Sequence, residues 1–127
     1  MYVLDSDVAV EFLRGREEVV RSVLSLESVC TTVITVAELS YGVHKSQNPE
    51  RHRKKLSDFV RGIRIFTINL PVCDKFGELK AHLAKIGRPA EDFDIFIASI
   101  CIVNGCHLIT RNRKHYQDVP GLRIYDL

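Results

Sequence analysis

The sequence predicts an α/β domain built around a parallel sheet. Short apolar runs rich in β-branched residues alternate along the whole chain with segments whose apolar residues recur at helical spacing, which is the pattern of a parallel α/β fold. No linker or low-complexity segment interrupts this alternation. A chain of 127 residues can bury about two-thirds of its unfolded surface in one core. We therefore expect a single domain over residues 1–127.

The N-terminal part of the chain is expected to run strand, helix, helix, strand. Tyr2–Leu4 is a short apolar run typical of a buried strand, and residues 8–13 have helical spacing up to a stop near Gly15. Apolar residues at positions 19, 20, 23 and 24 give a second helix its buried face. The run SVCTTVI at residues 28–34 predicts the next strand.

Capping signals place the two helices that follow. Thr35 and Glu38 have the spacing of a capping box, which predicts a helix start at Thr35. Asn48 and Pro49 suit the cap and the first position of a further helix, and Gly62 is expected to stop it. The alternating run IRIFTI after Gly62 predicts a third strand.

The C-terminal half contains one apolar run whose periodicity is ambiguous. Residues 72–86 have helical spacing until Gly87, whereas residues 95–103 are apolar almost throughout and include several β-branched side chains. Asp92 as a cap and Asn104-Gly105 as a stop favour a buried central helix over a strand. HLIT and LRIYDL predict the last two strands, with a polar loop between them.

Several acids are expected at one edge of this sheet. Ligands of open parallel sheets bind outside the carboxyl ends of the strands, where the strand order reverses. Asp5 follows the first strand directly, and Glu38 and Asp94 fall in the first turns of predicted helices. The loop that begins at Arg111 follows the strand HLIT. These four segments, distant in sequence, are therefore expected to converge on one rim.

Each acid taken alone also fits a structural role, because helix N-termini favour acidic side chains. Asp5 or Asp7 suits the cap of the first helix, Glu38 suits the capping box, and Asp92 or Asp94 suits the start of the central helix. Acids that meet at one rim repel each other, however, by about 4 kcal/mol for two charges about 4 Å apart at an effective dielectric of about 20. A hard cation such as Mg²⁺ or Mn²⁺ would offset this repulsion. Carboxylates around such an ion indicate phosphodiester hydrolysis by metal-activated water.

Composition limits the other chemistries and the location. The N-terminus has no basic segment leading into an apolar signal core, and no run reaches the roughly 18 apolar residues of a membrane span. These features favour a cytoplasmic protein with no membrane partner. The four cysteines form no C-x-x-C pair and the five histidines have no zinc-ligand spacing, so free thiols are favoured over a disulfide or a zinc site.

Four segments, in order and spread over almost the whole chain, carry a family resemblance: YVLDSDVAVEFL, ITVAELSYG, EDFDIFIASICIVNGCHLITRN and YQDVPGLRIYDL. On these segments the sequence resembles the PIN-domain ribonucleases and, among them, the VapC-type toxins of prokaryotic toxin-antitoxin pairs. The resemblance implies a three-layer α/β/α domain with a central parallel sheet and an Mg²⁺- or Mn²⁺-dependent endoribonuclease that cuts structured RNA such as tRNA. It also implies a homodimer and a cognate antitoxin protein that blocks the site. Matched residue by residue, it gives catalytic and metal-binding roles to Asp5, Glu38 and Asp94.

Other positions of the site are less fixed by the resemblance. Ser6 falls where the family usually has Thr or Ser and suits a bond to a metal-bound water or to phosphate. Asp7 stands where the family usually has Asn, so it either caps the first helix or adds a carboxylate to the site. The fourth polar position, an acid in many relatives, falls here on Asn112 or His115, and Asp92 is an alternative one turn away.

Basic residues form two local clusters in a chain whose formal net charge is only +2. The cluster RHRKK at residues 51–55 is interpreted as a solvated helix face. Arg111, Arg113 and Lys114 follow the strand HLIT beside the predicted acids, where an RNA backbone needs positive charge. These three residues are therefore the predicted RNA contacts.

Two other functions are compatible with parts of the sequence. LDSDV after a strand resembles the D-x-D element of haloacid-dehalogenase-type phosphatases, with Asp5 as nucleophile and Asp7 as acid. That interpretation leaves the two later acids without a role. A PIN-like module that binds RNA or a partner protein without cutting is the other alternative, and Asn112 and His115 at the fourth position would favour it.

Overall fold

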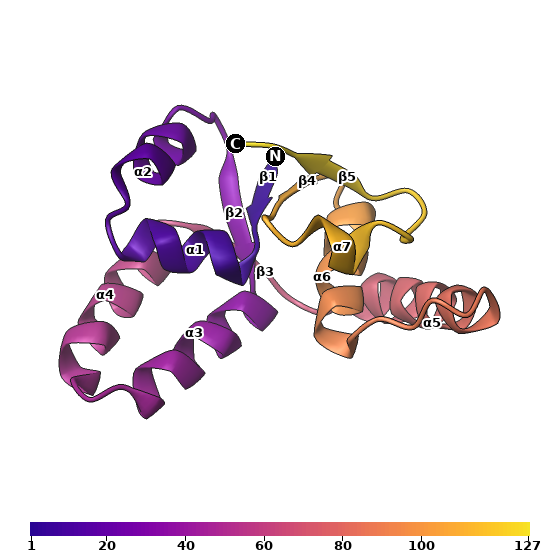
Figure 1. Ribbon diagram of the computed structural model, residues 1–127, viewed down its shortest axis with the longest axis horizontal. Helices are drawn as coiled ribbons and strands as arrows, with labels where there is room; N and C mark the ends of the chain where they lie inside the picture. The colour runs from indigo at the N-terminus through magenta and orange to yellow at the C-terminus, as the bar shows by residue number, and fades with distance from the viewer.

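A computed structural model describes residues 1–127 and contains one five-stranded sheet with helices on both faces (Figure 1). All pairs of neighbouring strands are parallel. The strands are β1 (Tyr2–Leu4), β2 (Val29–Thr32), β3 (Arg64–Phe66), β4 (His107–Ile109) and β5 (Arg123–Tyr125). The helices are α1 (Ser6–Leu13), α2 (Glu17–Leu24), α3 (Val33–Lys45), α4 (Pro49–Arg61), α5 (Leu70–Lys85), α6 (Asp92–Val103) and α7 (Arg113–Tyr116). The predicted three-layer α/β/α fold with a central parallel sheet is confirmed.

The order of the strands, β3-β2-β1-β4-β5, places β1 at the centre of the sheet. The chain builds β2 and β3 on one side of β1 and then crosses to β4 on the other side, so the strand order reverses between β1 and β4. Leu4 pairs with Ile109 at the end of these two strands. The next residues, Asp5 and Thr110, therefore stand side by side at the reversal, where open α/β sheets bind their ligands.

Alternate strand residues divide the interior into two apolar cores, one on each face of the sheet. Val3 and Leu108 pack with buried residues of α5 and α6. Their neighbours Leu4 and Ile109 pack with buried residues of α1, α2, α3 and α4. Figure 1 shows the same division, with the indigo and magenta helices on one side of the sheet and the orange ones on the other.

Helix α6 confirms the interpretation of the ambiguous apolar run as a buried helix. Half of its 12 residues are buried, namely Ile95, Ile97, Ala98, Ser99, Ile100 and Cys101. Asn104 is its C-cap, and Gly105 follows with φ of 65°, a conformation that glycine adopts without strain. The cap is Glu91 rather than the predicted Asp92, which lies in the first turn.

The starts of α1 and α3 differ from the sequence-based predictions. Helix α1 begins at Ser6, and Asp5 is its N-cap, accepting the backbone N–H of Ser6 at 2.8 Å. The predicted capping box at Thr35 is wrong, because Thr32 is the N-cap of α3 and accepts the N–H of Thr35 at 3.1 Å. The strand before α3 is shorter than its β-branched sequence suggests. Glu38 consequently lies in the second turn of α3, not in the first.

Other local predictions agree with the structure, with two exceptions. Asn48 caps α4, Pro49 is its first residue and Gly62 is its C-cap. Leu24 was expected on a buried face, but its side chain is 70% exposed. The loop between the last two strands contains the one-turn helix α7, which the sequence did not indicate.

The cysteines and the helix lengths bear on two further expectations. All four cysteines are free thiols, as predicted, and three of them are buried. Burial raises the pKa of the Cys30 thiol to about 12. None of the helices has both the length and the apolar character that crossing a bilayer requires.

Candidate functional site

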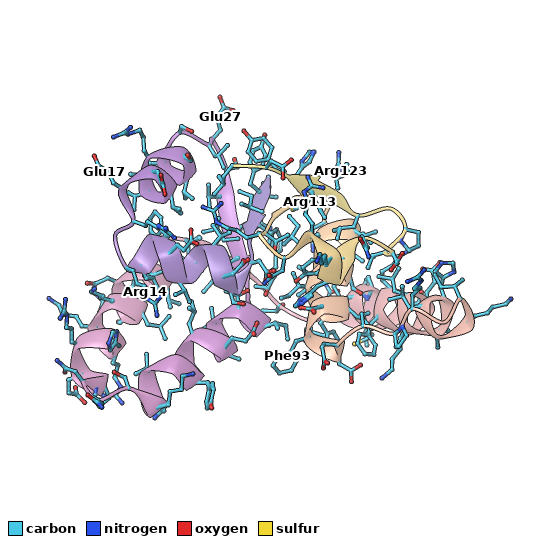
Figure 2. All side chains as sticks on the ribbon, in the orientation of Figure 1. Arg14, Glu17, Glu27, Phe93, Arg113 and Arg123 are labelled. Carbon is cyan, nitrogen blue, oxygen red and sulfur yellow. The ribbon has the colours of Figure 1, made fainter.

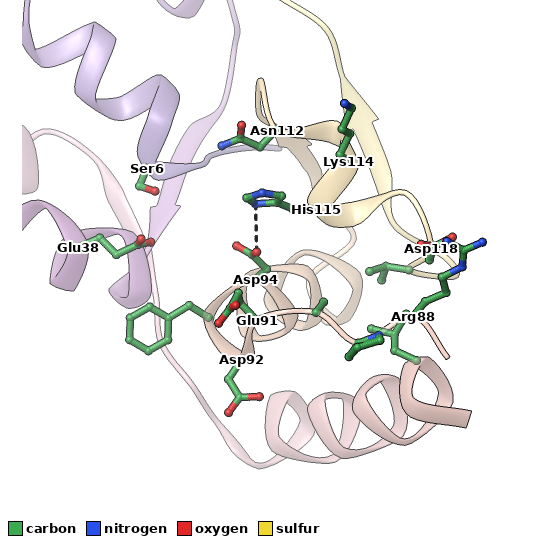
Figure 3. A pocket seen from close by; sticks show the side chains of 15 residues that line it. Ser6, Glu38, Arg88, Glu91, Asp92, Asp94, Asn112, Lys114, His115 and Asp118 are labelled. Atoms are coloured by element: carbon green, nitrogen blue, oxygen red, sulfur yellow. Dashed lines mark ion pairs between the residues drawn. The ribbon is translucent and has the colours of Figure 1, made fainter. Parts of the chain in front are cut away.

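The rim at the carboxyl ends of β1 and β4 opens into the largest of the cavities described, about 990 Å³ in volume. Seven of the sequence-predicted site residues line it: Ser6, Glu38, Asp92, Asp94, Asn112, Lys114 and His115. Figure 3 shows Ser6 and Glu38 on one side of this space and Asp94 with His115 on the other. The structure therefore brings together residues from α1, α3, α6 and the α7 region, which are far apart in sequence.

Asp5 lies beneath the cavity and is 4% exposed. Its Oδ2 atom accepts two hydroxyl bonds, from Thr110 at 2.8 Å and from Tyr116 at 2.9 Å. Its Oδ1 atom accepts the backbone N–H of Ser6 at 2.8 Å. A carboxylate oxygen has about two lone pairs. Oδ2 is therefore fully occupied, and Oδ1 is the atom of Asp5 that still has acceptor capacity.

Asp94 is held by two consecutive residues of α7. Its Oδ1 atom is 3.2 Å from the Tyr116 hydroxyl, and its Oδ2 atom is 3.3 Å from Nδ1 of His115. Burial raises the pKa of Asp94, and the contacts with His115 and Tyr116 oppose that rise. Of the two residues on which the fourth position was predicted to fall, Asn112 and His115, His115 is the one that contacts Asp94.

Glu38 completes the acidic cluster from the side of α3. Burial raises its pKa first, and the charges of Asp5, Asp94 and Asp7 raise it further, while the Ser6 hydroxyl lowers it. Charges that influence one another in this way belong to one electrostatic site. The repulsion that the sequence predicts at the rim is therefore present in the folded chain.

The donor set fits a hard divalent cation in its chemistry. Asp5, Glu38 and Asp94 offer carboxylate oxygens, the ligands that Mg²⁺ and Mn²⁺ prefer, and a cation would remove their mutual repulsion. As the side chains stand, no group of three His, Cys, Asp or Glu residues is gathered closely enough to hold a metal ion. Waters or a substrate phosphate would have to supply part of the coordination shell.

Asp7 is not the cap of α1, and its charge is among those that raise the pKa of Glu38 after burial. Its Oδ1 atom accepts the N–H of Val8 at 2.8 Å, and its Oδ2 atom accepts the N–H of Arg111 at 2.9 Å. It ties α1 to the loop after β4 and is not the cap of the helix. Burial raises the pKa of Asp7, and the N–H bond from Arg111 opposes that rise.

Asp92 and Asn112, the alternatives for the fourth position, line the cavity in different ways. Asp92 pairs with Lys80 at 2.8 Å, and Figure 3 shows its side chain directed away from Asp94. The backbone N–H of Asn112 donates to Thr110 Oγ1 at 3.0 Å, which supports the hydroxyl that contacts Asp5. Neither side chain contacts Asp94 in the way that His115 does.

The three predicted RNA-contacting cations differ in their availability. Both Nε and Nη2 of Arg111 contact Oε2 of Glu11, at 3.2 and 3.0 Å. Arg113 makes a two-bond pair with Asp126, at 2.9 and 2.8 Å, beside strand β5 (Figure 2). Lys114 makes no ion pair and lines the cavity. Lys114 is therefore the cation of the three that is free to meet a phosphate.

Two residues of the site were missed by the sequence analysis. Tyr116 is 1% exposed and its hydroxyl contacts both Asp5 and Asp94. Thr110 bonds to Asp5 from the neighbouring strand. A signal for Thr110 existed, since it follows the strand paired with β1. Tyr116 had only the weak signal of an aromatic residue inside a polar segment.

The raised pKa of Glu38 predicts a pH-dependent stability of the metal-free protein. A carboxyl whose folded-state pKa lies above its ordinary value of 4.5 stabilises the fold fully below that value, and this contribution is lost as the pH rises through the folded-state pKa. Glu38→Gln, which stays neutral, is therefore expected to raise the thermal midpoint in EDTA at neutral pH. The gain is expected to shrink toward about pH 4. Thermal denaturation followed by circular dichroism measures the midpoint at neutral pH and at acidic pH.

The matched control for this prediction is Glu27→Gln. Glu27 is exposed and makes no ion pair, so its replacement is expected to leave the midpoint nearly unchanged at both pH values. An equal gain from Glu38→Gln at neutral and acidic pH would contradict the electrostatic explanation.

The sequence is similar to a known family over nearly its whole length. The family model described as "PIN domain" matches residues 2–122. A tRNA(fMet)-specific endonuclease VapC from Shigella flexneri is 31% identical over 127 residues, which cover 98% of this chain and 96% of the relative. A ribonuclease VapC2 from Haemophilus influenzae is 32% identical over 124 residues, covering 96% of this chain and 94% of the relative.

Solved structures give the same result for the fold. DNA-bound VapBC from Salmonella typhimurium superposes with a TM-score of 0.91 at 28% identity, over 98% of this chain and 96% of that chain. VapBC2 from Rickettsia felis, bound to a DNA fragment from its promoter, superposes with a TM-score of 0.90 at 25% identity, over 99% of this chain and 98% of that chain.

Proposed function

The chain belongs to the PIN-domain family and is a ribonuclease of the VapC type, and we propose that Asp5, Glu38 and Asp94 hold the divalent metal ion that its reaction requires. The observation that carries this proposal is the convergence of the three acids at the reversal of strand order, where burial first, and then the charges of Asp5 and Asp94, raise the pKa of Glu38. Acids gathered at that place repel one another, and a bound cation would offset this repulsion.

Each acid contributes a different element of the site. Asp5 is rigid, because three hydrogen bonds fix it, and it presents Oδ1. Glu38 and Ser6 form the opposite side of the cavity, so a cation between them and Asp94 would meet oxygen ligands from two directions. A bound Mg²⁺ or Mn²⁺ would lower the pKa of the attacking water and neutralise the leaving oxygen. Lys114 is placed to contact a neighbouring phosphate of the RNA.

The substrate and the partners follow from the relatives. The Shigella flexneri relative is described as specific for tRNA(fMet), which supports structured RNA such as tRNA as the substrate of this chain. The solved relatives are VapBC toxin-antitoxin complexes, which supports a cognate antitoxin that blocks the cavity. A homodimer that acts in the cytoplasm remains part of the proposal.

The proposal predicts cleavage that depends on a divalent metal. Purified protein, freed of any antitoxin, is expected to cut a total small-RNA pool at discrete positions with Mg²⁺ or Mn²⁺ and to leave it intact in EDTA. Gel electrophoresis and sequencing of the new ends give the cut positions. Adding Mn²⁺ back after EDTA is expected to restore the cuts, because removal of the metal leaves the carboxylates in place.

Intact RNA in every lane, with the protein folded and metal supplied, would contradict the proposal. Retained RNA binding under those conditions would instead support the module that binds without cutting. Within the same assay, Lys114→Ala is expected to raise KM and to lower the salt slope of RNA binding by about one. Lys85→Ala, an exposed lysine of α5 without an ion pair, is the matched control.

A further inference from the structure

Tyr116 carries a buried hydroxyl that the chemistry described above does not use. Its ring belongs to the apolar core that α5 and α6 build against the sheet. The hydroxyl, however, points to two acids, at 2.9 Å from Asp5 Oδ2 and 3.2 Å from Asp94 Oδ1. A phenylalanine would fill the same space, so packing alone does not account for the oxygen atom.

The Tyr116 hydroxyl has a single proton for its two carboxylate neighbours. A phenol has one proton and donates to one acceptor at a time. When the Tyr116 hydroxyl donates to Asp5, the contact with Asp94 brings two oxygen atoms together with no proton between them. Such a contact is unfavourable beside a charged carboxylate and is offset when a cation lies against Asp94. The contact between Tyr116 and Asp94 is therefore more favourable when a metal ion is bound.

The hydroxyl also determines which oxygen atoms remain for a ligand. Together with Thr110 it fills Oδ2 of Asp5, so this carboxylate has free capacity only at Oδ1. At Asp94 the Tyr116 oxygen lies 3.2 Å from Oδ1, and Nδ1 of His115 lies 3.3 Å from Oδ2. Both carboxylates are fixed in rotation by partners from the segment around α7. Both carboxylates therefore have their orientation fixed before a cation binds.

We propose that Tyr116 is a positioning residue whose hydroxyl joins Asp5 to Asp94 and fixes the spacing at which the two carboxylates share one cation. The inference rests on the metal-binding function proposed above. It makes α7, a helix of 4 residues, the element that positions two ligands, one between β1 and α1 and the other in α6. Outer partners of this kind typically change metal affinity by about 10- to 100-fold when they are removed.

The test is Tyr116→Phe, which keeps the buried ring and removes only the hydroxyl. Isothermal titration of the metal-free variant with Mn²⁺ alone is expected to give a dissociation constant at least about 10-fold higher than that of the wild type. In cleavage assays the half-saturating Mn²⁺ concentration is expected to rise by a similar factor. The rate at saturating Mn²⁺ is expected to recover most of its wild-type value, which a merely structural loss would not produce.

Tyr125→Phe is the matched control, because Tyr125 packs against Tyr2 and its hydroxyl makes no hydrogen bond to the acids. It is expected to leave Mn²⁺ affinity unchanged. Unchanged or tighter Mn²⁺ binding in a folded Tyr116→Phe protein would overturn the proposal while leaving the nuclease function intact. Failure of the wild type to bind Mn²⁺ or to cut RNA would overturn the proposed function itself.

A second variant keeps the proposal testable if Tyr116→Phe does not fold. Thr110→Val removes the other hydroxyl on Oδ2 of Asp5 at nearly constant volume. It is expected to weaken Mn²⁺ binding in the same direction, and a folded Thr110→Val protein with wild-type affinity would then overturn the proposal.

Discussion

Asp5→Asn is expected to lower the rate of RNA cleavage by at least about 100-fold and to leave the fold intact. The amide oxygen of asparagine can still accept the N–H of Ser6, so α1 keeps its cap. The amide nitrogen can donate to the hydroxyls of Thr110 and Tyr116, which rotate to accept. The substitution therefore removes one negative charge from the cluster without orphaning a buried group. Loss of that charge is expected to weaken binding of the cation at the proposed site.

Two measurements check this expectation on the same protein preparation. The initial cleavage rate of the small-RNA pool with Mn²⁺ is expected to fall to background, and the thermal midpoint is expected to stay within about 5 °C of the wild type. Asp74→Asn, at an exposed acid of α5 without a hydrogen bond, is expected to keep full activity. Wild-type cleavage by a folded Asp5→Asn protein would show that Asp5 is not a metal ligand.

Ile100→Ala is expected to reduce the free energy of unfolding by about 2–5 kcal/mol, because it opens a cavity in a close-packed core. Ile100 is 0% exposed in α6, the helix that carries Asp94 in its first turn. It belongs to the larger of the two cores, together with residues of α5 and of the sheet. This loss is a large share of the stability of about 5–15 kcal/mol of an ordinary domain. Urea denaturation measures it.

The control for this prediction is Ile86→Ala, at the C-cap of α5. Ile86 is 47% exposed, so the same chemical change is expected to reduce the unfolding free energy by well under half as much. Similar losses from the two variants would contradict the assignment of α6 to the interior. The pair thus distinguishes a buried segment from a surface segment at residues 95–103.

Local chemistry in the sequence was sufficient for most of the elements. The cap at Asn48 with Pro49, and the stop at Gly62, depend on bonds within a few residues, and all three are confirmed. The stop at Asn104-Gly105 is of the same kind. The error at Thr35 has a physical reason, because Thr32 and Thr35 are both able to cap and only pairing of β2 with its neighbours ends the strand at Thr32.

The site was only partly accessible from the sequence. Asp5, Glu38 and Asp94 could be selected because each follows a strand or lies near the start of a helix, and the sheet topology brings them to one rim. The hydrogen-bond and ion-pair partners of these acids could not be predicted from the sequence. Arg111 was expected to contact RNA, but Glu11 lies within reach of its guanidinium from α1. Only Lys114 retains the availability expected of all three cations.

The sequence by itself determined the alternation of strands and helices and the acids at their ends, because periodicity and capping depend on neighbours along the chain. Only the tertiary structure decided that Tyr116 lies between Asp5 and Asp94, and that Asp7 bonds to the N–H of Arg111. Tyr116 is 111 residues from Asp5 in the chain. Contacts over such a distance are set by the order of strands in the sheet and by the packing of α7 against it, which no local pattern records.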